Sequence, residues 1–253
     1  MSEWLGEIVA RFILWFEELK RQFIINFIDG DRWRYMWDGL GVTLKVTIFS
    51  LLLGIVIGVI VSIVRSTHDK NANSLRHGAG YTVLSFFNTI AKVYLTVIRG
   101  TPVVLQLLIF YFIIFVSSKN GVLIGTITFS INSGAYVAEI FRGGIMSIDN
   151  GQFEAGRSLG FSYIKTMRYI IIPQAFKNVL PSLLNEFIVL LKETAILGYA
   201  AIQDLTKGAN IIVGRTFSAF MPLIAAALVY LLIVMLLTLL VGRLERRLRS
   251  SEH

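Results

Sequence analysis

The sequence predicts an all-α, polytopic membrane protein with about five transmembrane helices. Of its 253 residues, 55% are hydrophobic and only 16% are charged, and the mean hydropathy is +0.69, whereas a water-soluble domain is far more polar. Apolar runs of about twenty residues recur along the chain, and a helix of about that length crosses the hydrocarbon core of a bilayer. Between two of these runs, a polar stretch at 150–181 is patterned as short helices rather than as a flexible loop.

The N-terminal segment 1–37 is predicted to be an amphipathic helix lying in the membrane interface. Apolar residues such as Phe12 and Trp15 alternate near the helical period with charged residues, which are too numerous for a span. Gly30, between two aspartates, breaks this helix. An aromatic belt of Trp33 and Trp37 then marks one membrane face.

The transmembrane domain is predicted to occupy 38–243 and to be followed by a basic tail at 244–253. The expected spans are Gly41–Val64, Tyr81–Val116, Val122–Ile148, Leu180–Ala201 and Phe217–Val241. The second span is interrupted at Arg99-Gly100-Thr101-Pro102, because proline removes a backbone donor and glycine frees the turn. The connections are a basic loop at Arg65–Gly80, a short turn at Ser117–Gly121, the polar loop at 150–173 and a loop at Asp204–Arg215.

The distribution of basic residues predicts the orientation of the spans. Lysine and arginine are concentrated in the loop at 65–80 and in the tail that begins at Arg243, which favours the cytoplasm for both. Counting back from the tail places the N-terminus outside and the loop at 150–173 inside. The basic residues behind the net charge of +8 are therefore expected to face anionic lipid headgroups and the cytoplasm rather than nucleic acid. We expect no cleavable signal peptide, because no small-residue cleavage site follows an apolar core near the N-terminus.

The polar stretch is predicted to fold as two short helices that form a rigid knob at the membrane surface. Asn150 or Gly151 caps the first helix, and Gly160 allows the chain to turn at its end. A second helix runs from Ser162 to Tyr169, and prolines at 173 and 181 mark the return to apolar sequence. The side chains expected on the exposed surface of the knob are Phe153, Phe161, Tyr163 and Met167. Exposed aromatic residues of this kind predict docking to a partner.

The composition excludes several kinds of chemistry. There are no cysteines, so disulfides and thiolate metal sites are absent. There is no G-x4-G-K-[ST] phosphate-binding loop, and the three histidines, His68, His77 and His253, lie in segments expected outside the bilayer. We therefore expect no enzymatic activity, no directly bound cofactor and no metal.

The polar stretch also resembles the EAA loop of the permease subunits of ABC importers. That family's pattern is E-A-A-x3-G-x9-I-x-L-P, and this chain has Glu154-Ala155-Gly156, then Gly160, then Ile170-Ile171-Ile172-Pro173. Glycine replaces the second alanine, and isoleucine replaces the leucine. Flanking motifs resemble the polar amino-acid branch of the family over about 37–242, namely Arg99–Pro102, Ser130–Tyr136, Glu139–Gly144, Pro173–Ala175 and Leu191–Thr194.

The resemblance implies a type I importer permease fold in a bacterial inner membrane, with the knob as a coupling helix. Its implied partners are a dimeric ABC ATPase that carries ATP and magnesium, a second permease copy or paralogue, and an extracytoplasmic solute-binding protein. The substrate would be a polar amino acid. The residues implied to contact the ATPase or to shape the coupling helix are Gly151, Phe153, Glu154, Ala155, Gly156, Ser158, Leu159, Gly160 and Phe161.

Polar residues inside the predicted spans are the candidates for a substrate path. A charged side chain at the centre of a bilayer costs about 2.5–3.5 kcal/mol on insertion scales, so such residues face protein or water. An amino acid carries both charges, and the candidates to meet them are Arg99, Thr101, Asn132, Ser133, Glu139 and Glu186. Structural roles or helix pairing are expected for Pro102, Arg142, Pro173, Lys192 and Glu193. For Arg99, Asn132 and Glu139, substrate contact and helix pairing remain equally open.

Three other functions are alternatives to an importer. An ion-coupled secondary transporter usually shows two repeated halves, and no internal repeat is visible. A membrane scaffold without a transport role would need neither the break at 99–102 nor the polar residues within the spans. An intramembrane hydrolase is disfavoured, because no span contains a histidine or a catalytic pair.

Overall fold

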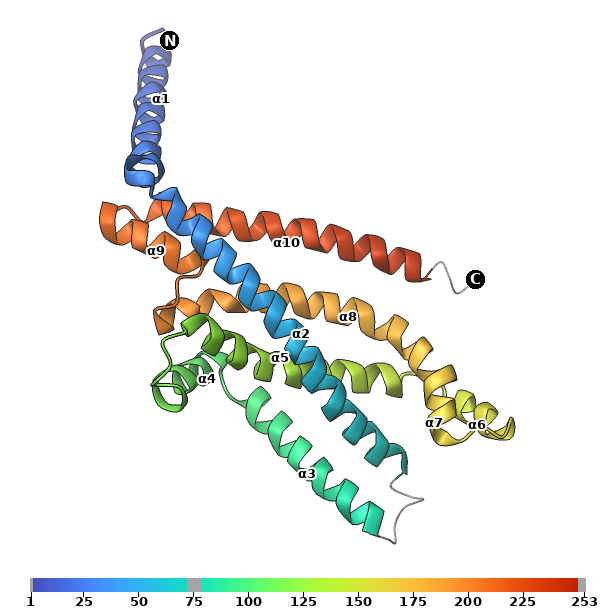
Figure 1. The fold of residues 1–253 in the computed structure, drawn as a ribbon. Helices are drawn as coiled ribbons and strands as arrows, with labels where there is room; N and C mark the ends of the chain where they lie inside the picture. The colour runs from blue at the N-terminus through green and yellow to red at the C-terminus, as the bar shows by residue number, and fades with distance from the viewer. Residues whose placement is uncertain (1, 72–78, 250–253) are drawn as a thin grey trace. The chain divides into compact units, whose positions relative to one another are not determined.

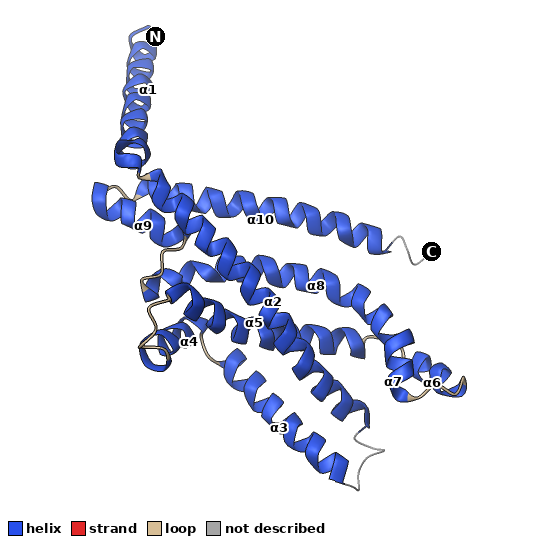
Figure 2. Ribbon diagram, viewed as in Figure 1, coloured by secondary structure: helices blue, strands red, loops and turns tan. Residues whose placement is uncertain are grey.

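A computed structural model describes residues 2–71 and 79–249, and within them every regular element is a helix (Figure 2). This confirms the all-α class. Four of the described helices are long and apolar enough to cross a membrane, namely Trp33–Asp69, Gly80–Gly100, Gly121–Met146 and Phe220–Arg247. The described chain forms two compact units, one from Met1–Leu44 with Ala195–Ile233 and the other from Lys45–Thr194 with Val234–His253.

The first unit contains the N-terminal helices and the region before the last span. Its elements are α1 (Ser2–Phe23), η1 (Ile24–Ile28), η2 (Asp29–Asp31), the start of α2 (Trp33–Asn71), most of η5 (Thr194–Ala200), α9 (Leu205–Thr216) and the start of α10 (Phe220–Arg249). Gly30 adopts a φ of +61° between α1 and α2, at the expected break. The unit's core contains Phe27, Met36, Leu205 and Ile212.

The expected loop at Asp204–Arg215 is wrong, because residues 205–216 form α9 (Figure 1). Asp204 starts this helix by accepting hydrogen bonds from the backbone N–H groups of Thr206 and Lys207 at 3.1 and 2.9 Å. Glycine residues then bring α9 against α2. A Cβ on Gly39 would overlap the carbonyl of Asp204, and one on Gly208 would overlap the carbonyl of Tyr35. A sequence pattern does not show this close approach between two helices.

The second unit contains the remaining spans and the knob. Its further elements are α3 (Ala79–Gly100), α4 (Val103–Ile109), η3 (Phe110–Ile114), α5 (Gly121–Met146), α6 (Asn150–Ser158), α7 (Tyr163–Thr166), η4 (Met167–Ile171) and α8 (Ile172–Glu193). Helices α5 and α8 lie side by side (Figure 1), with Val137 of α5 packed among Val179 and Leu183 of α8. Gly144 has no room for a Cβ, because Val179 occupies that space.

Several predicted boundaries change. Helix α2 continues to Asn71, so the loop expected from 65 begins later, and Arg76, His77 and His253 lie outside the described residues. Helix α3 is long enough to cross a membrane by itself, so residues 81–116 form two helices separated by Thr101 and Pro102 rather than one interrupted span.

The fourth expected span, 180–201, is not among the four described helices that are long and apolar enough to cross a membrane, and its helix also has other bounds. Helix α8 starts at Ile172, directly after a π-helical segment at Met167–Ile171, and Pro173 lies in its first turn. It continues through Pro181 and ends at Glu193, and the 3₁₀ helix η5 follows. Proline is therefore inside this helix at 181 rather than at its boundary.

We predict that Asp204 stabilises the first unit as a helix cap while its charge opposes folding. Asp204→Ala should lower the free energy of unfolding by about 1 kcal/mol, because α9 loses its N-cap. Burial raises the pKa of Asp204, so the folded state favours the protonated acid. The wild type should then lose stability as pH rises from the ordinary carboxyl range through the raised pKa.

Asp204→Asn is the matched control, since it keeps an acceptor oxygen and does not titrate. Its stability relative to the wild type should increase over that pH interval and then level off. Thermal unfolding of the purified protein, followed by tryptophan fluorescence at several pH values, measures both effects. A constant difference between the two proteins across the interval would contradict the assigned charge penalty.

Candidate functional site

The first candidate site is the knob between α5 and α8. Helix α6 starts at Asn150, and its cap is Asp149, whose Oδ1 accepts from the Gly151 N–H at 2.7 Å. The expected cap, Asn150 or Gly151, is therefore wrong by one or two positions. An aspartate before the helix satisfies a free backbone N–H and also places negative charge at the positive end of the helix dipole.

Gly160 ends α6 as expected. Its φ is +78°, a left-handed conformation that favours glycine. The Gly160 N–H donates to the Arg157 carbonyl at 2.9 Å, and the Phe161 N–H donates to the Gly156 carbonyl at 3.0 Å. This pair of bonds is a Schellman motif, which satisfies carbonyls that the helix end would leave free. Ser162 then caps α7 by accepting from the Lys165 N–H at 3.4 Å.

The apolar surface of the knob differs from the predicted one. Phe153 and Met167 pack inward against a core that includes Ile145 and Ile171, and Tyr163 is half-buried. The most exposed apolar side chains are Leu159 and Ile164, at 74% and 75%. Sequence reasoning took aromatic type as the signal for exposure, but large rings gain more from burial. Phe161, at 37% exposed, and Tyr169, at 62%, remain accessible.

Gly156, which stands where the EAA pattern has alanine, lies at the contact between α6 and α7. It is buried, and a Cβ built on it would lie 2.6 Å from Thr166 Cγ2 and 2.8 Å from Thr166 Oγ1. Both distances are far below van der Waals contact. Glycine therefore replaces the alanine of the family pattern at a position where Thr166 occupies the space that an alanine methyl group would need. The Thr166 hydroxyl is buried without a hydrogen-bond partner among the described residues.

The knob continues into α8 without an intervening loop. The π-helical segment η4 connects α7 to α8, so residues 163–193 form one uninterrupted helical path. The base of α8 is also tied to the end of α5, because Asn178 Nδ2 donates to Ser147 Oγ at 3.0 Å. A displacement of the knob would therefore be transmitted directly to α8.

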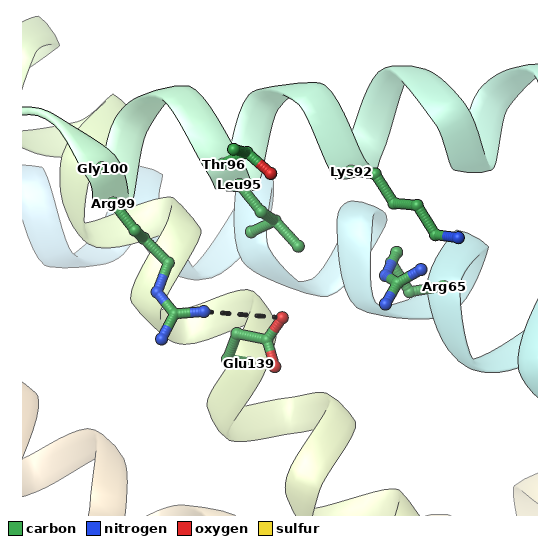
Figure 3. Close-up of a pocket in the computed structure, with 7 residues that line it drawn as sticks. All are labelled: Arg65, Lys92, Leu95, Thr96, Arg99, Gly100 and Glu139. Atoms are coloured by element: carbon green, nitrogen blue, oxygen red, sulfur yellow. Dashed lines mark ion pairs between the residues drawn. The ribbon is translucent and has the colours of Figure 1, made fainter.

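The second candidate site is a cavity of about 470 Å³ among α2, α3 and α5 (Figure 3). It is lined by Arg65, Lys92, Leu95, Thr96, Arg99, Gly100 and Glu139. Arg99 and Glu139 were predicted from the sequence, whereas Arg65, Lys92 and Thr96 were not. Helical spacing connects Lys92, Thr96 and Arg99 on one face of α3, and this was the signal that could have identified them.

The carboxylate of Glu139 is shared by two arginines. Arg142 donates to its Oε2 through Nη2 and Nε, at 3.0 and 3.1 Å. Arg99 Nη1 lies 3.7 Å from Oε1, and the Arg99 guanidinium also lies over the Tyr136 ring at 5.6 Å. Arg142 additionally reaches Asp69 of α2 at 3.8 Å. Glu139 is thus both a lining residue of the cavity and a member of an ion-pair network.

The remaining predicted polar residues connect helices. Asn132 of α5 donates to Gln106 Oε1 of α4 at 3.0 Å, and Gln106 in turn donates to Thr101 Oγ1 at 2.8 Å. This chain bridges the break at 101–102, and Gln106 was missed because a single glutamine in an apolar run gives no pattern. Pro102 is the residue immediately before α4.

Three further predicted residues lie on α8. Glu186 accepts from Ser133 Oγ of α5 at 2.9 Å. Within the described part of this single chain, Lys192 and Glu193 form no ion pair of 4 Å or less. Neither residue lines the cavity beside Arg99. The same described residues contain no group of three His, Cys, Asp or Glu side chains that could hold a metal ion.

Comparisons with known proteins show what the whole chain is similar to. The family described as "Binding-protein-dependent transport system inner membrane component" matches residues 79–250. The arginine transport system permease protein ArtQ of Bacillus subtilis is 35% identical over 223 residues, which cover 86% of this chain and 94% of ArtQ. The glutamine transport system permease protein GlnP of Escherichia coli (strain K12) is 38% identical over 166 residues, covering 64% of this chain and 76% of GlnP.

Solved structures give the same fold. A crystal structure of an amino acid ABC transporter with histidines matches with a TM-score of 0.74 and 38% identity, covering 85% of this chain and 94% of the other. An inward-facing MetNI methionine ABC transporter matches with a TM-score of 0.70 and 18% identity, which supports the fold alone.

We predict an energetic coupling between Gly156 and Thr166. Gly156→Ala alone should destabilise the protein, because the new methyl group overlaps the threonine side chain. Thr166→Ala alone should cost little, since it removes a hydroxyl that is buried without a partner. In the double variant the overlap with the threonine side chain is removed and Ile170 Cδ1, at 3.2 Å, is the close atom that remains, so a double-mutant cycle should yield a favourable coupling of about 1 kcal/mol.

Thermal unfolding of the four proteins in one detergent measures this cycle. Gly144→Ala, which introduces a methyl group against Val179 at another tight contact, is the control. It should be destabilising with or without Thr166→Ala. Additive effects of Gly156→Ala and Thr166→Ala would show that the two positions do not compete for the same space.

Proposed function

The chain belongs to the family of binding-protein-dependent transport system inner membrane components, and from this premise we propose that it is the permease subunit of an ABC importer for polar amino acids. The polypeptide would form the path through the membrane, and a separate ATPase would supply the energy. The names of its relatives, which are permeases for glutamine and arginine, support an amino-acid substrate.

The knob is proposed to be the contact with the ATPase. The observation that supports this proposal is the uninterrupted helical path from α7 through α8, together with a capped α6 that packs against the end of α5. The exposed Leu159 and Ile164 provide an apolar docking surface, and Glu154 provides a charge beside it. Closure of an ATPase dimer would move two knobs, and α8 would carry that motion into the spans.

The basic residues indicate the orientation that we propose for the chain in the membrane. Arg243, Arg246 and Arg247 lie near the end of α10, which favours the cytoplasm for the C-terminus. The knob would then be cytoplasmic and the N-terminus extracytoplasmic. A solute-binding protein would deliver the amino acid on the outer side. The segment 1–37 would lie in the membrane interface, with lipid around its exposed Trp4 and Trp15.

The cavity at Arg99 is proposed to be part of the substrate path. It offers both signs of charge, which the carboxylate and ammonium groups of an amino acid require. Its volume of about 470 Å³ falls in the range of small-molecule sites. A second copy of this chain or a paralogue would complete the path, because about five spans are few to enclose it alone.

Substitution at Gly160 tests the coupling. Gly160→Asp should leave membrane insertion intact and abolish assembly with the ATPase, because a charged side chain then projects from the tip of the docking surface. Space is available for it, since no atom lies within 4 Å of a Cβ at this position. Co-purification of the ATPase and ATP-dependent amino-acid uptake in proteoliposomes are the measurements.

Gly30→Asp is the matched control. Gly30 also has a positive φ, of +61°, and also has open space around its Cβ position, but it lies far along the chain from the knob. Both variants therefore carry a similar local backbone strain, and aspartate is among the residues that tolerate this conformation best. Equal assembly and uptake for the two variants would count against the knob as the coupling element.

A further inference from the structure

We propose that the cavity at Arg99 selects amino acids whose side chain ends in a carboxylate or amide oxygen and rejects those whose side chain ends in a cation. This inference rests on the proposed importer function and narrows its substrate. The relatives do not decide the matter, since their names include both glutamine and arginine. Selectivity depends on which charges in the cavity are already neutralised.

The one carboxylate among the described lining residues can bind only one cationic group of a substrate. Glu139 Oε2 receives two hydrogen bonds from Arg142, and its Oε1 faces Arg99 at 3.7 Å. Oε1 is therefore the oxygen that remains for the α-ammonium group. A lysine or arginine side chain of the same substrate would find no second carboxylate among the described residues that line the cavity.

Two lining cations, in contrast, have no carboxylate partner among the residues that the structure describes. Arg65 donates from Nη1 to the neutral Asn88 amide at 3.0 Å, and its Nε is buried without a hydrogen-bond partner among the described residues. Within the same part of the chain, no acidic oxygen lies within 4 Å of Lys92. Unpaired cations with unused donors favour an acceptor oxygen.

The charges are also divided along the cavity. Arg99 and Glu139 lie together at one end, and Lys92 and Arg65 lie together toward the other (Figure 3). The first end offers both signs and suits the α-carboxylate and α-ammonium groups of the substrate. The second end would then face its side chain and is purely cationic.

The net charge of the lining supports the same selection. Three cations, Arg65, Lys92 and Arg99, and one anion, Glu139, give +3 − 1 = +2. The opposite charges of Arg142 and Asp69, which lie next to the lining, cancel one another, so including them leaves the net charge unchanged. A substrate with a cationic side chain would raise the total, and like charges in one site repel each other. A carboxylate lowers the total, and an amide oxygen leaves it unchanged while accepting a hydrogen bond.

Equilibrium binding to the permease–ATPase complex in lipid nanodiscs tests the selection. Radiolabelled glutamate, glutamine and arginine are used as probes, without the solute-binding protein, so that only the permease discriminates. Glutamate and glutamine should bind at least tenfold more tightly than arginine. Lys92→Gln should weaken glutamate binding at least tenfold and should bring arginine closer to the other two.

Lys119→Gln, at an exposed lysine in the turn before α5, is the control and should change binding less than twofold. Arg65→Gln provides a second variant should Lys92→Gln fail to assemble with the ATPase. Arginine binding as tight as glutamate binding, or glutamate binding that is insensitive to both substitutions, would overturn the inference. So would the absence of amino-acid binding together with retention of anionic phospholipid that depends on Lys92, which would make the cavity a lipid site.

ATP-driven uptake in proteoliposomes with the binding protein separates this inference from the function on which it rests. Uptake of an amino acid without the expected preference would refute the selectivity and leave the importer function standing. Absence of ATP-dependent uptake for every amino acid would refute the function itself.

Discussion

Polar atoms inside a bilayer have little water to bind, so it is costly to leave them without a partner in the protein. Helix α5 shows how this constraint organises the second unit. Asn132 reaches Gln106 on α4, Ser133 reaches Glu186 on α8, and Glu139 faces Arg99 on α3. Each pairing fixes α5 against a different neighbour. The same residues that hold the helices together therefore also place charge beside a cavity.

The knob obeys a different constraint, because it lies outside the spans and can be solvated. Its shape is determined by hydrogen bonds to the backbone groups at the helix ends, through Asp149, Gly160 and Ser162. Its position is determined by Phe153 and Met167, which anchor it to the end of α5. Rigidity then results from two sources, local caps and an apolar base. The proposed transmission of motion requires both, since a well-capped hairpin that was poorly packed against α5 would move without displacing α8.

Structural and functional roles are not alternatives for the residues at the cavity. The sequence left helix pairing and substrate contact equally open for Arg99 and Glu139. In the structure Glu139 belongs to an ion-pair network and lines the cavity as well. That double role has a chemical consequence, because a carboxylate already held by two arginines can bind the α-ammonium group of a substrate but no second cation. The cations without such partners then dominate the electrostatics of the cavity.

By itself the sequence determined the helical class, most spans, the break at 101–102 and the turn at Gly160, because hydropathy, proline and glycine act through local physics. It also determined the family, through motifs that are ordered along the chain. Only the tertiary structure decided that Phe153 packs inward and that residues 205–216 form a helix against α2. It alone also decided that Thr166 fills the space beside Gly156, and that Lys92 and Arg65 share a cavity with Glu139. These features depend on contacts between segments far apart in the sequence. A single chain's residue pattern contains the side chains of such contacts but not their distances, and it is the distances that determine which charges are paired.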